Sequence, residues 1–453
     1  MRRSPTTALA VVAIAAGVAL LGVAGVAGVA ASGVAGGVAG SGAGPDATPA
    51  VPAAQAAQAG PAAQAGPDAG RDRGQLAITK IQDRLRDNPR DADTWARLGA
   101  AYVEQARITA DPSYYGRAQG ALQRSLELAP EGNGPALIGM GALANARHEF
   151  AAARAWALRA QAVLPDSAQV YGVLADALTQ LGEHAAATEA VQRMLDLRPS
   201  VASFTRASYD LELHGRLAEA GRAMQRALAD VNSPDQAAFC HYHLGELAFN
   251  AGRLDEALRH YESAPDAVLS RHGQAKVAAA RGNLDAALDG YRRLVGTVPL
   301  PEYLIEYAEL LTVAGRPAEA GAQYAVLAEQ QRLAPDDLEA SEAAARRGDG
   351  QTALRLARAE WERRQHVEVA DALAWALHIT GRHAEALTFA DRAAGLGGVN
   401  ATFAYHRGAI LLGLGRIGEA AEALATALRI NPYFSPVDAP LARATLARLR
   451  SGR

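Results

Sequence analysis

The segment CHYHLGE holds the densest set of possible metal ligands in the chain, at Cys240, His241, His243 and Glu246. On a helix, His241 and His243 are two residues apart and point to opposite sides, so they cannot share one ion. Cys240 with His243, or His243 with Glu246, could still do so. A buried free thiol beside two surface or groove histidines accounts for the same residues. The sequence therefore predicts no metal site.

Catalytic and cofactor-binding patterns are also missing from the sequence. The other histidines lack a neighbouring carboxylate and nucleophile at the spacing of a catalytic triad. The stretch LLGLGRIGEA has glycines at Gly413, Gly415 and Gly418, but no strand precedes it, so it does not fit a dinucleotide-binding loop. We expect a protein with no catalytic residues and no cofactor.

Composition indicates which elements must position these side chains. Of the 453 residues, 49% are hydrophobic but only 5% are aromatic, and alanine and leucine dominate. This profile is typical of closely packed short helices and not of sheets. The net charge of −3 supplies no excess of positive charge for a phosphate backbone, so nucleic acid is not expected as a partner. The fold class predicted is all-α.

The N-terminal part of the sequence reads as a targeting segment followed by a tether. Arg2 and Arg3 precede a stretch from Ala8 to Ala31 without charged residues, which suits a signal peptide or a membrane anchor over residues 1–31. Residues 32–75 are rich in Ala, Gly, Pro and Gln and are predicted to be a disordered linker. Both alternatives predict an extracytoplasmic protein, either secreted or anchored to the cytoplasmic membrane by the apolar segment.

From Leu76 onward, glycine-containing turns recur at intervals of 30 to 37 residues, which indicates a solenoid of helical repeats. The glycines are Gly182, Gly215, Gly252, Gly282, Gly315, Gly348, Gly381 and Gly415. An alanine follows five residues after each of them, and a small residue lies seven residues before. Two antiparallel helices joined by a tight turn approach closely only where their contact points lack bulk. We therefore expect both small positions at helix contacts.

The first repeat carries the pattern of a known family, W-x2-L-G-x2-Y followed by A and P, at Trp95, Leu98, Gly99, Tyr102, Ala118 and Pro130. In this respect the chain resembles tetratricopeptide repeat (TPR) proteins of exported bacterial type. The resemblance implies an α-solenoid over residues 76–435, with a half repeat and about ten helix-turn-helix repeats in a right-handed superhelix. Residues 436–453 are expected to form a C-terminal capping helix.

In TPR proteins the first helix of each repeat lines a concave groove. If positions 4, 7, 8 and 11 face the second helix, positions 2, 5, 9 and 12 form another face at helical spacing. That face is acidic and aromatic here. The predicted partner-binding residues are Tyr209, Glu212, Tyr242, Glu246, Glu302, Glu309, Asp371 and Trp375. Lys276 is expected to pair with Glu246 from the neighbouring repeat.

The resemblance and the acidic face together predict a non-enzymatic scaffold that recruits a protein or peptide bearing Arg or Lys. The membrane would be contacted only through the N-terminal segment. Two alternatives stay open at this point. The chain could bind a small molecule or a glycan, or it could be a hydrolase that uses groove carboxylates.

Overall fold

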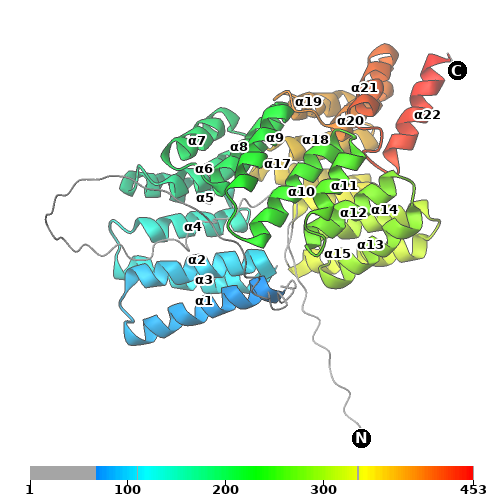
Figure 1. Cartoon of the computed structure of the whole chain (residues 1–453). Coiled ribbons are helices and arrows are strands. Elements are labelled where there is room, and N and C mark those ends of the chain that lie inside the picture. The colour runs from blue at the N-terminus through cyan, green and yellow to red at the C-terminus, as the bar shows by residue number, and fades with distance from the viewer. Residues whose placement is uncertain (1–67, 110, 334–335, 452–453) are drawn as a thin grey trace, which may run out of the picture.

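The structure is a computed structural model that describes residues 68–109, 111–333 and 336–451 (Figure 1). Within these ranges every regular element is a helix, and 22 helices follow one another along the chain. The predicted all-α solenoid is therefore confirmed. The predictions for residues 1–31 and for most of the linker fall outside the described residues.

The helices of the first half have the following bounds: α1 (Asp68–Asp87), α2 (Ala92–Thr109), α3 (Ser113–Leu128), α4 (Gly134–Ala146), α5 (Phe150–Val163), α6 (Ala168–Gln180), α7 (His184–Leu197), α8 (Val201–Leu213), α9 (Leu217–Ala229), α10 (Pro234–Asn250) and α11 (Leu254–Glu262). Those of the second half are α12 (Val268–Ala280), α13 (Leu284–Thr297), α14 (Pro301–Val313), α15 (Pro317–Leu333), α16 (Asp337–Arg346), α17 (Gly350–Arg363), α18 (Val367–Ile379), α19 (His383–Ala393), α20 (Ala401–Gly413), α21 (Ile417–Ile430) and α22 (Asp438–Arg450).

Ten helix pairs, from α2/α3 to α20/α21, make up the repeats in the described part of the chain. The two helices of each pair pack against each other, and each pair packs against the next pair along the chain. The fifth repeat begins at Pro234 because Ser233 accepts a hydrogen bond from the Gln236 backbone N–H at 3.3 Å and caps the helix there. At the opposite ends, α1 contacts α2 and α22 contacts α21. Helix α1 begins at Asp68, inside the segment predicted to be linker.

In the second to tenth repeats a left-handed residue follows the first helix, and in most of them it is a glycine. Gly182 takes φ 77° there, and the next residue, Glu183, donates its N–H back to the Leu178 carbonyl at 2.9 Å. The second repeat is the exception in the described chain, since His148 holds the same place with φ 60°. A side chain in this conformation is strained, because its Cβ crowds the backbone.

The small residues of the repeat do lie at helix contacts. A Cβ added to Gly245 would lie 2.3 Å from the Tyr261 ring, so only glycine lets α10 pack against α11 in this way. Ala287 and Ala320, which follow their turn glycines by five residues, are both buried. The packing thus explains why both positions recur in the sequence.

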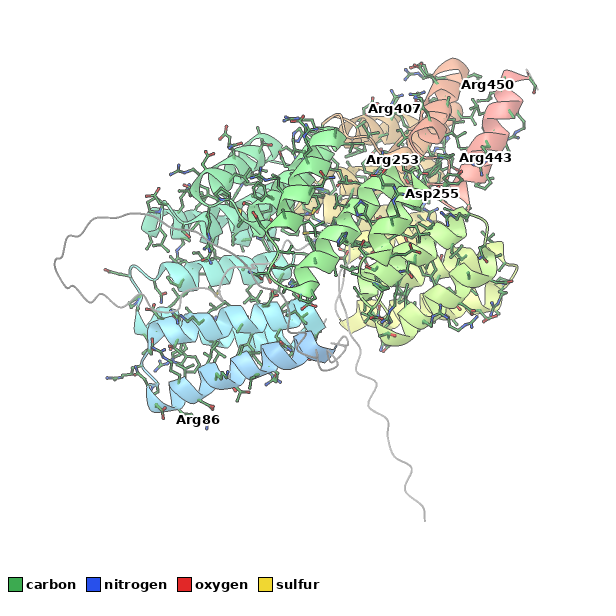
Figure 2. The ribbon with its side chains drawn as sticks, in the orientation of Figure 1. Arg86, Arg253, Asp255, Arg407, Arg443 and Arg450 are labelled. Carbon is green, nitrogen blue, oxygen red and sulfur yellow. The ribbon has the colours of Figure 1, made fainter. Side chains whose placement is uncertain are left out.

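Contacts also join parts of the solenoid that are far apart in sequence. Arg364 donates a 2.5 Å hydrogen bond to Gln180, which precedes it by 184 residues. Asn431 donates to the Phe249 carbonyl at 2.9 Å, and the next residue, Pro432, lies against Gly252. Figure 2 shows Arg253, which follows that glycine, and Asp255 of α11 on the side of the molecule that carries Arg443. The turns of the third to fifth repeats thus approach the segments that follow the eighth to tenth repeats, and in the fourth repeat Gly215 lies against Gly397.

The localisation prediction needs correction. It placed the protein outside the cytoplasm, secreted or anchored to the cytoplasmic membrane by an N-terminal apolar segment. Among the residues that the structure describes, no helix has both the length and the apolar character needed to cross a bilayer. The segment from Ala8 to Ala31, on which the prediction depended, lies outside the described residues.

Candidate functional site

The first helices of the middle and late repeats bring carboxylates together on the inner side of the superhelix. We call this set the acidic interior; its members are Glu212 on α8, Glu246 on α10, Glu302, Glu306 and Glu309 on α14, Glu342 on α16 and Glu368 on α18. The charges of Glu342, Glu212 and Glu302 all raise the pKa of Glu368, so helices up to five repeats apart face the same space.

Protonation is favoured at several carboxyls of this interior. Burial, helped by neighbouring carboxylates, raises the pKa of Glu368 to about 8. The same causes raise the pKa of Glu212 and Glu309 to about 7, although Arg346 acts in the opposite direction at Glu309. Burial is the largest cause of these shifts, and the neighbouring carboxylates add to it.

Cations of the interior are already engaged. Lys276 donates to Glu246 at 2.6 Å, which confirms the expected pair, and Tyr261 donates to the other oxygen of the same carboxylate at 2.6 Å. Arg346 lies between Glu309 and Asp438, at 2.9 Å and 2.7 Å. In the described chain, Glu302 and Glu342 have neither a hydrogen bond nor an ion pair. The carboxylates of these two residues can therefore accept hydrogen bonds from a ligand.

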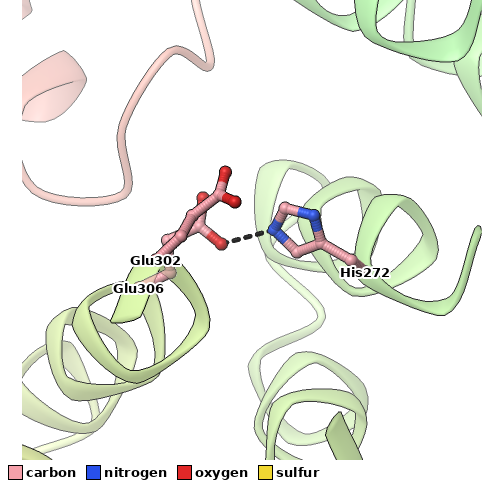
Figure 3. A group of neighbouring side chains, drawn as sticks. All are labelled: His272, Glu302 and Glu306. Atoms are coloured by element: carbon pink, nitrogen blue, oxygen red, sulfur yellow. Dashed lines mark hydrogen bonds and ion pairs between the residues drawn. The ribbon is translucent and has the colours of Figure 1, made fainter. Parts of the chain in front are cut away.

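A tightly packed polar group lies where α10, α12 and α14 meet. His272 is fully buried, and its Nε2 lies 2.5 Å from Glu306 Oε2 (Figure 3). Its Nδ1 lies 3.1 Å from the Tyr242 hydroxyl, and Tyr291 donates to Glu306 at 2.9 Å. Burial opposes the charged imidazole, but the Glu306 carboxylate outweighs it and raises the pKa of His272. Glu302 completes a group of three possible metal ligands whose donor atoms lie within 4.8 Å of one another.

Two of the three aromatic residues predicted for the groove, Tyr209 and Trp375, have different surroundings. The Tyr209 hydroxyl lies 3.2 Å from Nε2 of His366, which belongs to the other side of the superhelix. Trp375 stacks on His406 with ring centroids 4.2 Å apart, and His406 Nδ1 lies 2.8 Å from Asp371 Oδ2. Asp371 is buried in this contact, and its Oδ1 has no hydrogen-bond partner. Tyr209 therefore takes part in closing the superhelix, while Trp375 and Asp371 form a separate cluster.

Sequence reasoning placed some groove residues and missed others. Tyr242, Glu246 and Glu302 converge around α12, and Glu212 and Glu309 lie further along the same interior. Glu306 was missed because it occupies position 6 of its repeat, outside the positions 2, 5, 9 and 12 used for the prediction. Glu306 follows Glu302 by four residues, and this spacing would have placed both side chains on the same face of the helix.

Cys240 and His243 are not part of the group of possible metal ligands identified among the described residues. Cys240 is fully buried in a cluster with Met224 and Leu244, and burial raises the pKa of its thiol to about 11. Burial also lowers the pKa of His243 to about 4, against the opposite effect of Glu246. The thiol packs as a small apolar side chain, in agreement with the simpler interpretation of this segment.

Comparisons with known proteins agree on the type of repeat. Family models described as tetratricopeptide repeat match residues 132–202, 207–268 and 401–434. No curated protein sequence matches the chain. A tetratricopeptide repeat protein from Parabacteroides merdae ATCC 43184 is 18% identical, with 55% of this chain and 98% of that chain covered and a TM-score of 0.34. For PilF of Pseudomonas aeruginosa the identity is 15%, the coverage 51% and 94%, and the TM-score 0.35.

Proposed function

Because this chain is built of tetratricopeptide repeats, we propose that it is a non-enzymatic scaffold whose acidic interior binds a protein segment bearing Arg or Lys. Repeats of this kind commonly present a concave surface to partner proteins. The observation that carries the proposal is the excess of carboxylates over cations in the interior. The acidic interior has seven carboxyls, and the cationic side chains that pair with its members in the described chain include Lys276, Arg346 and His272.

A cationic side chain entering the interior would relieve this repulsion. Its charge would favour the ionised form of each carboxyl nearby, and hydrogen bonds to carboxylates are stronger than those between neutral groups. Glu302 and Glu342 are the acceptors without a partner in the described chain. Arginine suits such a pair of carboxylates because its guanidinium presents several donors in a fixed plane.

Binding of defined peptides tests this proposal. Twelve-residue peptides with four Arg or Lys, and matched peptides with four Glu, would be titrated against the full chain at low and high salt by fluorescence anisotropy. We expect the basic peptides alone to bind, with an affinity that falls as salt is added. Reversing Glu342 and Glu368 to Lys should abolish binding at both salt concentrations.

Matched controls lie on the outer helices. Reversing Asp285 of α13 and Glu262 of α11 to Lys changes the net charge by the same amount at exposed positions away from the interior. These variants should bind the basic peptides as the unchanged chain does, and circular dichroism should show that all variants are folded. Equal loss of binding in the outer-face variants would refute an interior site.

A further inference from the structure

One group in the interior has the composition of a metal site. His272 comes from α12, and Glu302 and Glu306 come from one face of α14, as Figure 3 shows. Their three donor atoms lie within 4.8 Å of one another. One imidazole nitrogen with two carboxylate oxygens is a donor set that zinc and related divalent ions accept. The set comes from two neighbouring repeats, so the packing of the repeats assembles it.

Two of the three ligands are already held in place by neighbours. The Tyr242 hydroxyl lies 3.1 Å from Nδ1 of His272, which leaves Nε2 directed toward the carboxylates. Tyr291 donates to Glu306, and the Tyr303 ring lies 4.5 Å from the imidazole. Groups of this kind fix the orientation of a ligating histidine and raise metal affinity. Full burial of His272 also prevents its ring from turning away to solvent.

The charges around the group favour a cation of charge +2. Lys276, whose charge acts on both Glu302 and Glu306, donates to Glu246 and lies over the Phe249 ring at 4.6 Å, so it is held by other partners. Glu302 has no hydrogen bond or ion pair within the part of the chain that the structure describes. Two carboxylates therefore face one imidazole with no further positive charge bound directly to either of them.

We propose that His272, Glu302 and Glu306 bind one divalent transition-metal ion of the zinc class, through Nε2 and one oxygen from each carboxylate. Water would occupy the fourth position, since three protein ligands leave a tetrahedral ion open on one side. The ion would replace the hydrogen bond between His272 and Glu306 and would join α12 to α14. This inference goes beyond the scaffold function and does not depend on peptide binding.

Calorimetric titration of the full chain with ZnCl2, after removal of metal by EDTA and dialysis, tests the proposal. We expect the unchanged chain to bind one zinc ion and Glu302→Gln to lower the zinc affinity at least tenfold. Changes to groups that only support a ligand already lower metal affinity by roughly 10- to 100-fold. Since Glu302 has no partner in the described chain, this variant should fold normally. Glu342→Gln serves as the matched control, because it also removes a carboxylate from the acidic interior but not one of the three ligands. The zinc affinity of this variant should be unchanged.

A second variant leaves all three ligands in place. Tyr242→Phe removes the hydroxyl beside Nδ1 and should weaken zinc binding by roughly 10- to 100-fold. Zinc should also raise the melting temperature of the unchanged chain and not that of Glu302→Gln. The proposal is overturned if the chain binds no zinc, or if Glu302→Gln and Glu342→Gln bind it equally well. Equal binding would place the ion at another group, such as His378 and His383, whose Nδ1 atoms lie 3.1 Å apart.

Discussion

Arg364, at the end of α17, donates a hydrogen bond to Gln180, at the end of α6, across 184 residues of sequence. In repeat proteins each repeat usually contacts only its neighbours, so the stability of the chain is approximately a sum of terms from single repeats and from adjacent pairs. Here a buried arginine joins repeats that are five apart. It also pairs with Glu360 and lies 5.5 Å from the centre of the Phe150 ring. The side chain therefore connects three separate helices of the solenoid.

Removing the acceptor of this bond should destabilise the whole chain. We expect Gln180→Ala to lower the free energy of unfolding by about 1.5 to 3 kcal/mol, the range for hydrogen bonds to charged groups. Urea unfolding followed by circular dichroism measures it. Gln192→Ala is the control, since the exposed Gln192 has one hydrogen bond in the described part of the chain, to Asp196 on its own helix. Similar small changes in both variants would show that the contact between distant repeats contributes little.

Enlarging a small residue at a helix contact should also be costly. Ala287 and Ala320 are buried between helices, so changing either to Leu should cost about 1 to 3 kcal/mol through overpacking. Ala318→Leu is a matched control because Ala318 is exposed on the same helix as Ala320. Thermal and urea unfolding of the three variants compare them directly. A control as unstable as the buried variants would contradict this account of the repeat.

Stability should fall as the pH rises from 6.5 to 8.5. The pKa of Glu368 is about 8 in the folded chain, against an ordinary value of 4.5. Between these values the folded state keeps a proton that the unfolded state has lost, so the contribution is present at low pH and disappears through about pH 8. Buried His366 and His378, whose pKa values are about 3 and 4, act in the opposite direction below pH 6.5.

Glu368→Gln isolates this effect, because glutamine does not titrate. Unfolding measured at pH 6.5, 7.5 and 8.5 should show a shallower loss of stability in Glu368→Gln than in the unchanged chain. The exposed Glu262→Gln on α11 should leave the slope as it is. Identical slopes in all three proteins would mean that Glu368 titrates as an ordinary carboxyl.

The left-handed residue of the second repeat offers a test of backbone strain. His148 has φ 60°, stacks on Phe150 and lies 3.3 Å from Asp336. His148→Gly and His148→Ala both lose these contacts and differ only in the Cβ. We therefore expect the glycine variant to be more stable than the alanine variant by about 1 kcal/mol. Urea unfolding at one pH measures the difference, and a more stable alanine variant would contradict it.

Local features of the fold were predictable from the sequence because they depend on spacing within one repeat. The eight turn glycines recognised from their spacing, among them Gly182, Gly315 and Gly381, all follow a first helix with positive φ. Glu302 and Glu309 were placed on the inner face for the same reason. Ile305, three residues after Glu302 on the same helix, is instead buried in a cluster with Leu327.

The contacts between distant repeats were not predictable in this way. Gly182 meets Gln365 only because a small rotation from each repeat to the next accumulates over five repeats. No single residue type encodes that rotation. His272 and Glu306 are a different case, since they lie 34 residues apart on neighbouring repeats and were not paired because Glu306 is outside the positions assigned to the inner face.

The same closure has a consequence for synthesis of the chain. Ribosomes add about 5 to 20 residues per second, so Gln180 is made roughly 10 to 40 s before Arg364, its partner 184 residues later. Throughout that interval the earlier repeats can fold against their neighbours, but the wall formed by α16 and α18 does not yet exist. The nascent chain thus presents Glu212 and Glu246 on an open trough, and only the last repeats enclose them.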